Sequence, residues 1–290
     1  MMFIVGVLIA ILSAASWAMG TIIFDKIGKK MPAEGITFFK SAMSVLLMAA
    51  LMLVFGFEMP TGRQLLFLAL SGLIGISIGD TLFFRSLQHL GVKMQVLYFI
   101  LGQVLTVFLS YLFLGEILTL LQYIGACVVI VGVLLVIFDK QDSRPNKFKG
   151  IVEGLLAMIC YSVSIILIKS VLDDVSAVTA TFYRMLFSVI FVLIGGLFGK
   201  KVKAWAEPLK QRNTLALFAV NAVIVTYGGF LMSVLALKYI DVSIASILST
   251  TEPLFALLFA FLINKDKPTK RELIGAAITF IGVLMMIVFQ

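Results

Sequence analysis

Four ionisable side chains interrupt long apolar stretches of the sequence and are the first candidates for chemistry. They are Lys40, Asp80, Arg184 and Glu252. An ionisable group inside an apolar helix is costly unless it faces a partner or a water-filled cavity, so such groups usually mark functional sites. Two acids and two bases can form ion pairs, bind a charged ligand or carry a proton.

Glu252 lies in the middle of the apolar segment 241–263 and is followed by Pro253. If the segment is helical and crosses a membrane, Glu252 lies about 16 Å from either end, near the bilayer centre. Pro253 cannot donate to the carbonyl of Ser249, so it frees that oxygen and kinks the helix. A kinked segment with a carboxylate and hydroxyl groups suits a substrate or proton site. A structural carboxylate that bonds neighbouring hydroxyls is the alternative.

Lys40 and Asp80 lie near the same end of two consecutive apolar segments. Consecutive antiparallel helices are neighbours, so the sequence predicts that the two side chains can form an ion pair that acts as a gate. Two alternatives stay open, because Lys40 can extend its ammonium to the lipid headgroups and Arg85 is a rival partner for Asp80. The guanidinium of Arg184 suits a carboxylate or phosphate, so Arg184 can face Glu252 or an anionic substrate group, or extend to the membrane surface.

A second set of aromatic and amide side chains could line a cavity around these charges. In membrane helices such residues more often serve packing or anchor the helix at the interface. The candidates are Trp17, Tyr98, Gln103, Tyr161, Tyr183, Asn221 and Tyr227.

The composition shows what kind of elements must position these residues. The chain has 290 residues, of which 61% are hydrophobic and 13% charged, whereas soluble domains are about 45–50% apolar and about 25% charged. A soluble fold of this length has too little interior for so many apolar side chains. The composition therefore excludes a soluble enzyme, a disordered chain and a nucleic-acid-binding domain. It predicts an all-α integral membrane protein.

Ten apolar segments are each long enough to cross a bilayer, which takes about 20 residues. The first is expected to be a retained helix and not a signal peptide, because no basic residue precedes it. The segments are 2–24, 36–57, 64–87, 93–114, 117–138, 150–171, 177–198, 213–237, 241–263 and 271–290.

The basic residues predict how the chain is oriented. Eighteen of the 23 Lys and Arg residues lie in or beside the links after the odd-numbered segments, and three (Arg63, Lys169, Lys238) lie in the other links. Cytoplasmic loops are enriched in Lys and Arg, so both termini are expected outside the cytoplasm of a plasma (inner) membrane. The net charge of +8 is thereby explained without a nucleic-acid partner. The basic link 200–212, with Trp205, is expected to lie against the headgroups.

The sequence also repeats itself. Residues 17–44 match 161–188 at an offset of 144, and residues 87–92 match 237–242 at an offset of 150. The match predicts a first repeat at 1–138, a linker at 139–149 and a second repeat at 150–290. Five helices in each repeat would make the second copy cross the membrane in the opposite sense, as in many secondary transporters.

The chain resembles the EamA family of the drug/metabolite transporter superfamily. The motifs that carry the resemblance are 113–116 (FLGE), 121–126 (LQYIGA) and 132–133 (GV), with 252–253 (EP), 273–276 (LIGA) and 281–283 (IGV) in the second half. The resemblance implies a central cavity surrounded by segments one to four and six to nine, with the fifth and tenth at the periphery. It also implies export or exchange of amino acids, nucleotide-related compounds or drugs. The sequence departs from the family pattern at Gln103, where a proline is usual.

These observations predict a secondary transporter of small metabolites that works by alternating access, with Glu252 as one option for proton coupling. A channel and a membrane scaffold are the alternatives. The partners expected are a small-molecule substrate, the lipid bilayer and, as an option, protons. No cofactor, metal ion or enzymatic activity is expected, because the sequence has no ATP-binding motif and its two cysteines have no metal-ligand spacing.

Cysteine labelling tests the predicted orientation. In a chain without Cys127 and Cys160, an impermeant maleimide applied to intact cells should modify Asp174→Cys and leave Lys203→Cys unmodified, because the charge bias places Lys203 in the cytoplasm. The opposite labelling pattern would reverse the orientation.

Overall fold

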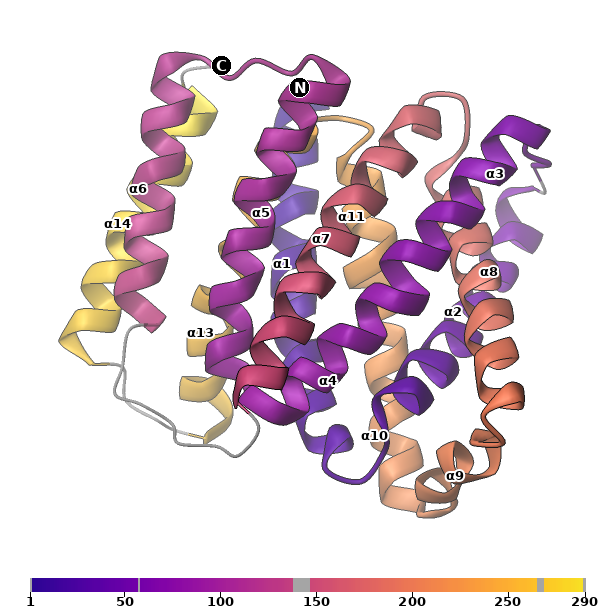
Figure 1. The fold of residues 1–290 in the computed structure, drawn as a ribbon. Helices are drawn as coiled ribbons and strands as arrows, with labels where there is room; N and C mark the ends of the chain where they lie inside the picture. The colour runs from indigo at the N-terminus through magenta and orange to yellow at the C-terminus, as the bar shows by residue number, and fades with distance from the viewer. Residues whose placement is uncertain (1, 57, 138–146, 265–268, 289–290) are drawn as a thin grey trace.

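The computed structural model describes residues 2–56, 58–137, 147–264 and 269–288. In these ranges the regular structure is entirely helical (Figure 1). The first part of the chain forms α1 (Met2–Gly28), α2 (Ala33–Phe55), α3 (Gly62–Ser71), η1 (Gly72–Asp80), α4 (Thr81–Leu90), α5 (Val92–Leu114) and α6 (Leu120–Ile137). The second part forms α7 (Lys147–Leu172), α8 (Ala177–Phe198), α9 (Val202–Ala206), η2 (Glu207–Lys210), α10 (Arg212–Val223), η3 (Ile224–Leu231), α11 (Met232–Ala236), α12 (Val242–Ser249), α13 (Glu252–Asn264) and α14 (Lys270–Val288).

Helix ends follow from local sequence signals. Thr61 and Gln64 form a capping box at the start of α3, with the Thr61 N–H donating to the Gln64 side chain at 2.7 Å. Ser176 caps α8 by accepting from the Thr179 N–H at 3.1 Å. Gly115 ends α5 at a φ of 69°, in the left-handed region that a glycine adopts without a steric penalty.

The described residues contain seven helices that are long and apolar enough, by length and composition, to cross a membrane. They are Met2–Gly28, Ala33–Phe55, Gly62–Leu90, Phe148–Leu172, Ala177–Phe198, Arg212–Ala236 and Val242–Phe259. The apolar helices Tyr98–Leu114, Leu120–Leu135 and Leu273–Val288 are shorter. Each predicted apolar segment thus contains a helix and the all-α class is confirmed, while the number of ten crossings stays a prediction.

Three of the predicted segments are not regular α-helices. A π-helical stretch, η1, joins α3 to α4, and a second one, η3, joins α10 to α11. The segment predicted at 241–263 is broken at Thr250 and Thr251, between α12 and α13. The amide N–H groups of these two threonines bond the third carbonyl before them, at 3.0 Å each, so the turn is tighter than an α-helical turn. Hydropathy alone cannot detect these changes, because it does not depend on the hydrogen-bond register.

The bundle brings together helices from distant parts of the chain. α2 packs against α8, and α7 packs against α4, α5 and η1. α6 and α14 lie side by side at one edge of the molecule (Figure 1). Large apolar side chains such as Phe113, Phe198 and Phe280 face outward, as expected for a surface that contacts lipid.

Glycines allow α6 and α14 to approach closely in two matching places. A Cβ added at Gly282 would lie 2.7 Å from the backbone nitrogen of Val129 and 2.8 Å from the carbonyl oxygen of Gly125. A Cβ added at Gly132 would likewise meet Thr279 and lie 2.8 Å from the carbonyl oxygen of Gly275. The two helices therefore touch backbone to backbone, as at small-residue interfaces in membranes.

The link 200–212 folds into α9 and η2, and Trp205 is buried at 2% exposure. Its position against the headgroups stays a prediction. A Cβ at Gly35 would meet Trp205 at 3.0 Å, and one at Gly196 would overlap its indole ring. The two glycines make room for the ring between α2 and α8, which is why it packs inside.

The glycine contact predicts a difference between two alanine substitutions. Gly282→Ala should lower the thermal unfolding midpoint in detergent, because overpacking against backbone costs roughly 1–3 kcal/mol. Gly195→Ala is the matched control, since nothing lies within 4 Å of a Cβ at that position, and alanine favours a helix over glycine by about 1 kcal/mol. Equal midpoints for the two variants would show that the α6–α14 interface tolerates an added methyl group.

Candidate functional site

A cavity of about 1150 Å³, including the part open to solvent, lies among α1, α5, α7, α12 and the two π-helical stretches. Its walls are mostly apolar, and a few polar groups converge on it. The acidic, basic and amide groups are Asp80, Gln95, Gln103, Arg184 and Glu252, and hydroxyl groups from α1, α7, α11 and α12 lie between them. Concave, apolar sites with few polar groups are typical of small-molecule binding. Within the described ranges, no three His, Cys, Asp or Glu side chains gather as metal ligands.

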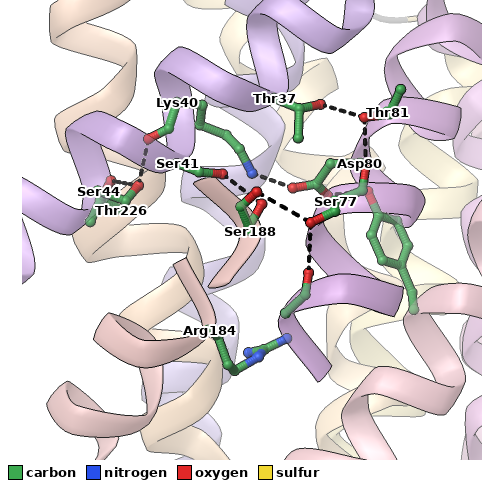
Figure 2. A network of polar contacts seen from close by, with 12 residues as sticks. Thr37, Lys40, Ser41, Ser44, Ser77, Asp80, Thr81, Arg184, Ser188 and Thr226 are labelled. Carbon is green, nitrogen blue, oxygen red and sulfur yellow. Dashed lines mark hydrogen bonds and ion pairs between the residues drawn. The ribbon is translucent and has the colours of Figure 1, made fainter. Parts of the chain in front are cut away.

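Lys40 of α2 and Asp80 of η1 form an ion pair (Figure 2), and Asp80 lines the cavity. The Lys40 side chain is 0% exposed and that of Asp80 3%. Asp80 also accepts a hydrogen bond from the Tyr161 hydroxyl at 2.6 Å. On its other side, the Lys40 ammonium lies 4.2 Å from the centre of the Phe230 ring, a favourable cation–π contact.

Hydroxyl groups extend this ion pair into a network between the two parts of the chain. Ser44 and Thr226 are 2.6 Å apart, Ser41 and Ser188 are 3.2 Å apart, and the Ser77 hydroxyl donates to the Ser188 carbonyl at 3.3 Å (Figure 2). These bonds tie α2 and η1 to α8 and η3. The charged pair is therefore held by both halves of the molecule.

Arg184 of α8 lines the cavity with a partly unpaired guanidinium. Its Nη2 donates to the Ser164 hydroxyl at 3.1 Å, while its buried Nε has no hydrogen-bond partner among the residues that the structure describes. The residue is only 7% exposed. Since buried donors are normally satisfied, the free Nε is suited to an acceptor on a bound molecule.

Glu252 is the first residue of α13, directly after the break that follows α12. It is 8% exposed and accepts one hydrogen bond, from the Thr21 hydroxyl at 3.2 Å. Among the described residues it has no ion-pair partner, unlike Asp80. Because a buried charge without a partner is costly, the Glu252 carboxylate is suited to bind a proton or a cationic group.

Six of the residues proposed from the sequence line this cavity: Trp17, Asp80, Gln103, Tyr161, Arg184 and Glu252. Trp17 donates to the Ser233 hydroxyl at 3.4 Å and meets Phe230 edge to face, with ring centres 4.7 Å apart. Lys40 lies behind Asp80, and Pro253 follows Glu252 in the first turn of α13. Arg85, the rival partner of Asp80, pairs instead with Glu34.

Four other residues proposed for the cavity lie outside its lining. Tyr183 donates to the Met59 sulfur at 3.3 Å, and Tyr227 donates to the Leu47 carbonyl at 3.2 Å. Asn221 donates to the Gly20 carbonyl at 3.2 Å, and Tyr98 packs in the apolar core beside Gly154. None of the four is among the residues that line this cavity, and the Oδ1 atom of Asn221 is buried without a partner among the described residues. Their role in a substrate site stays a prediction.

Several lining residues were not singled out from the sequence. Gln95 is 1% exposed, and within the described ranges neither its amide nitrogen nor its amide oxygen has a hydrogen-bond partner. Ser13, Thr21, Ser164 and Ser233 also contribute. The sequence signal that could have identified Gln95 is an amide side chain inside an apolar segment. Serine and threonine are too common at helix–helix contacts to signal a site.

Comparisons with known proteins agree with the cavity-forming bundle. The EamA-like transporter family matches the chain twice, over residues 4–138 and 148–288. The chain belongs to this family. EamA belongs to the drug/metabolite transporter superfamily, so the predicted resemblance is confirmed, and the apolar helices are those of an integral membrane protein.

Two relatives and one solved structure illustrate how far the likeness extends. An uncharacterized transporter of Synechocystis is 25% identical over 78% of this chain and 66% of its own length. An uncharacterized transporter of Archaeoglobus fulgidus is 29% identical over 47% of each chain. The EamA chain thus spans less than two thirds of either relative. One crystal structure superposes on 100% of the chain and 99% of its own length, with a TM-score of 0.72 and 17% identity, which shows the fold alone.

The buried ion pair predicts a large stability effect. Asp80→Asn should destabilise the protein by about 3–5 kcal/mol, because it leaves the Lys40 ammonium buried and unpaired, and adding Lys40→Met should recover most of the loss. Glu34→Gln breaks the half-exposed pair with Arg85 and should cost at most about 1 kcal/mol. Thermal unfolding in detergent compares the three variants. An Asp80→Asn protein as stable as the unchanged chain would show that Lys40 does not need the charge.

Proposed function

We propose that the protein is a secondary active transporter that moves small metabolites by alternating access, as an exporter or exchanger. The observation that carries the proposal is Glu252, a buried carboxylate at a helix break beside a cavity, without a cationic partner in the part of the chain that the structure describes. Broken helices near the bilayer midplane supply the substrate and ion sites of many secondary transporters. Membership in a transporter family supports a role other than enzymatic catalysis.

We infer that ten membrane helices form two inverted five-helix repeats, at 1–138 and 150–290, joined by the linker 139–149, which lies largely outside the described residues. Pairs of equivalent contacts support this arrangement. A Cβ at Gly229 would meet the Trp17 ring at 3.1 Å, and one at Gly79 would meet the Tyr161 ring at 3.1 Å. Trp17 and Tyr161 occupy equivalent positions in the repeat, and so do Gly79 and Gly229. Each contact joins the two halves.

The α6–α14 interface supports the same axis. Gly132 contacts Gly275 and Thr279, and Gly282 contacts Gly125 and Val129. Gly125, Val129 and Gly132 become Gly275, Thr279 and Gly282 when 150 is added to their numbers, so the two sets of contacts are equivalent in the repeat. A two-fold axis produces such reciprocal contacts, and the pairing of early with late residues makes the helices antiparallel. We place this axis in the membrane plane, with both termini outside the cytoplasm of a plasma membrane.

The charges around the cavity favour substrates with polar or charged groups and an apolar body. Arg184 suits a carboxylate or phosphate, because its guanidinium has an unpaired donor. Glu252 binds a proton or a cationic group, and the Trp17, Phe83 and Phe230 rings provide apolar contact. Amino-acid-like, nucleotide-related and drug-like metabolites fit this combination. Competition between a proton and a substrate for Glu252 would couple their movements.

Countertransport in liposomes tests the proposed function. Candidate substrates come from a metabolite screen for thermal stabilisation of the purified protein, because a ligand that binds the native state stabilises it by mass action. Substrate on the opposite side should accelerate uptake of labelled substrate, as in a carrier. A linear flux that does not saturate would indicate a channel. A protein that binds a stabilising metabolite but never moves it would contradict the proposal.

Replacing one carboxylate tests the coupling. A gradient of one pH unit, worth 1.36 kcal/mol per proton, can drive about tenfold accumulation in a one-proton exchange. Glu252→Gln should abolish this accumulation and retain exchange of substrate for substrate. Glu153→Gln is the matched control, because Glu153 is also buried but pairs with His89 away from the cavity. Intact pH-driven accumulation in Glu252→Gln would refute proton coupling through this residue.

A further inference from the structure

Glu116, just beyond the end of α5, binds the start of a helix from the other half of the chain. Its Oε1 accepts from the backbone N–H of Val242 at 2.8 Å. Its Oε2 accepts from the backbone N–H and from the hydroxyl of Ser243, both at 2.8 Å. One carboxylate thus occupies the N-terminus of α12 with three hydrogen bonds.

Local features place the carboxylate at this position. Gly115 reverses the chain after α5 with its φ of 69°, and the Glu116 N–H bonds back to the Ser110 carbonyl at 3.4 Å. Asp241, at the N-cap position of α12, makes no side-chain capping bond. Free N–H groups at a helix N-terminus attract a negative charge, so Glu116 supplies from α5 the cap that α12 lacks.

The contact lies close to residues that line the cavity. Here α5 packs along α12, and the Ser110 and Ser243 hydroxyls are 2.6 Å apart. Ser246 of α12, one turn further on, lines the cavity. After the break at Thr250 and Thr251 the chain leaves α5, and α13 packs against α1 and α6. The two halves are therefore joined at the Glu116 end through α5 and α12, while α12 and α13 both pack against α1 on either side of the break.

We propose that Glu116 is a latch that holds the α5 and α12 ends together and that must release α12 when this end of the cavity opens. The inference rests on the proposed transport function, because only alternating access requires this end to open. Hydrogen bonds to a charged group are stronger than neutral ones, and the three bonds end on a single side chain. The α5 and α12 ends can therefore separate when the hydrogen bonds of one side chain break, without unfolding of either helix.

A second carboxylate on the chain provides a matched control. Glu58, in the link between α2 and α3, accepts from the backbone N–H of Ser176 at the start of α8 at 3.0 Å. This hydrogen bond lowers the pKa of Glu58. Glu58 is exposed and does not line the cavity. It thus provides a carboxylate bond to a helix N-terminus that also joins the two halves, but between the α2–α3 link and α8 and away from the α5–α12 contact.

Spin-label distance measurements between the ends of the two helices test the latch. Labels at Phe113→Cys and Lys238→Cys, in a chain without Cys127 and Cys160, report the separation of α5 from the segment that precedes α12. Glu116→Gln should raise the ratio of long to short distances about tenfold, equivalent to 1.4 kcal/mol. Glu58→Gln should leave the ratio unchanged. Unchanged distances in Glu116→Gln, or equal shifts in the two variants, would overturn the latch.

A milder variant keeps the test decisive if Glu116→Gln does not fold. Ser243→Ala removes one of the three bonds and should shift the ratio in the same direction by a smaller factor. No shift in Ser243→Ala would then overturn the latch. Since distances are measured without substrate, the two proposals fail separately. A shift without countertransport would contradict the transport function alone, and countertransport with unchanged distances would contradict the latch alone.

Discussion

The cost of burying charge inside an apolar bundle governs the centre of this molecule. Lys40 is fully buried, and its ammonium is stable there because Asp80 balances its charge and Phe230 offers the face of a ring. Asp80 in turn needs Tyr161. Since these side chains come from α2, η1, α7 and η3, satisfying one charge fixes the relative positions of four elements. The cavity forms beside this fixed group.

Much of the candidate site could be predicted from the sequence, because charges in apolar helices are few and costly. Asp80, Arg184 and Glu252 all line the cavity, and Lys40 meets Asp80. Aromatic residues were less informative. Trp17 and Tyr161 line the cavity, but Tyr98, Tyr183 and Tyr227 do not. A tyrosine can bury its ring and place its hydroxyl against other groups between helices, as Tyr227 does at the Leu47 carbonyl and Tyr183 at the Met59 sulfur. All five are aromatic, so the residue type does not separate those that line the cavity from those that do not. Only the packing of the helices decides which of them face the cavity.

For the fold too, the composition predicted where the long helices lie, while the packing between helices could not be predicted from it. Apolar length located each of the long apolar helices, but not the short helices α9 and η2 in the link 200–212. Pro253 cannot donate a backbone hydrogen bond, and it therefore indicated an irregular helix near Thr250. The burial of Trp205 was not predicted, because it depends on glycines at positions 35 and 196 that lie far apart in the sequence. Contacts of this kind are set by the meeting of two helices and leave no pattern in either one.

The π-helical stretches η1 and η3 change the geometry of the helices that contain them. A π turn bonds each N–H to the fifth carbonyl before it, and thus holds an extra residue compared with an α turn. One residue corresponds to a rotation of about 100° around the helix axis. Within one continuous helix, the side chains of α4 therefore point in directions rotated about the axis from those that a regular continuation of α3 would give. The same holds for α11 relative to α10. A helical wheel drawn through Gly62–Leu90 assigns the wrong face to one of its halves.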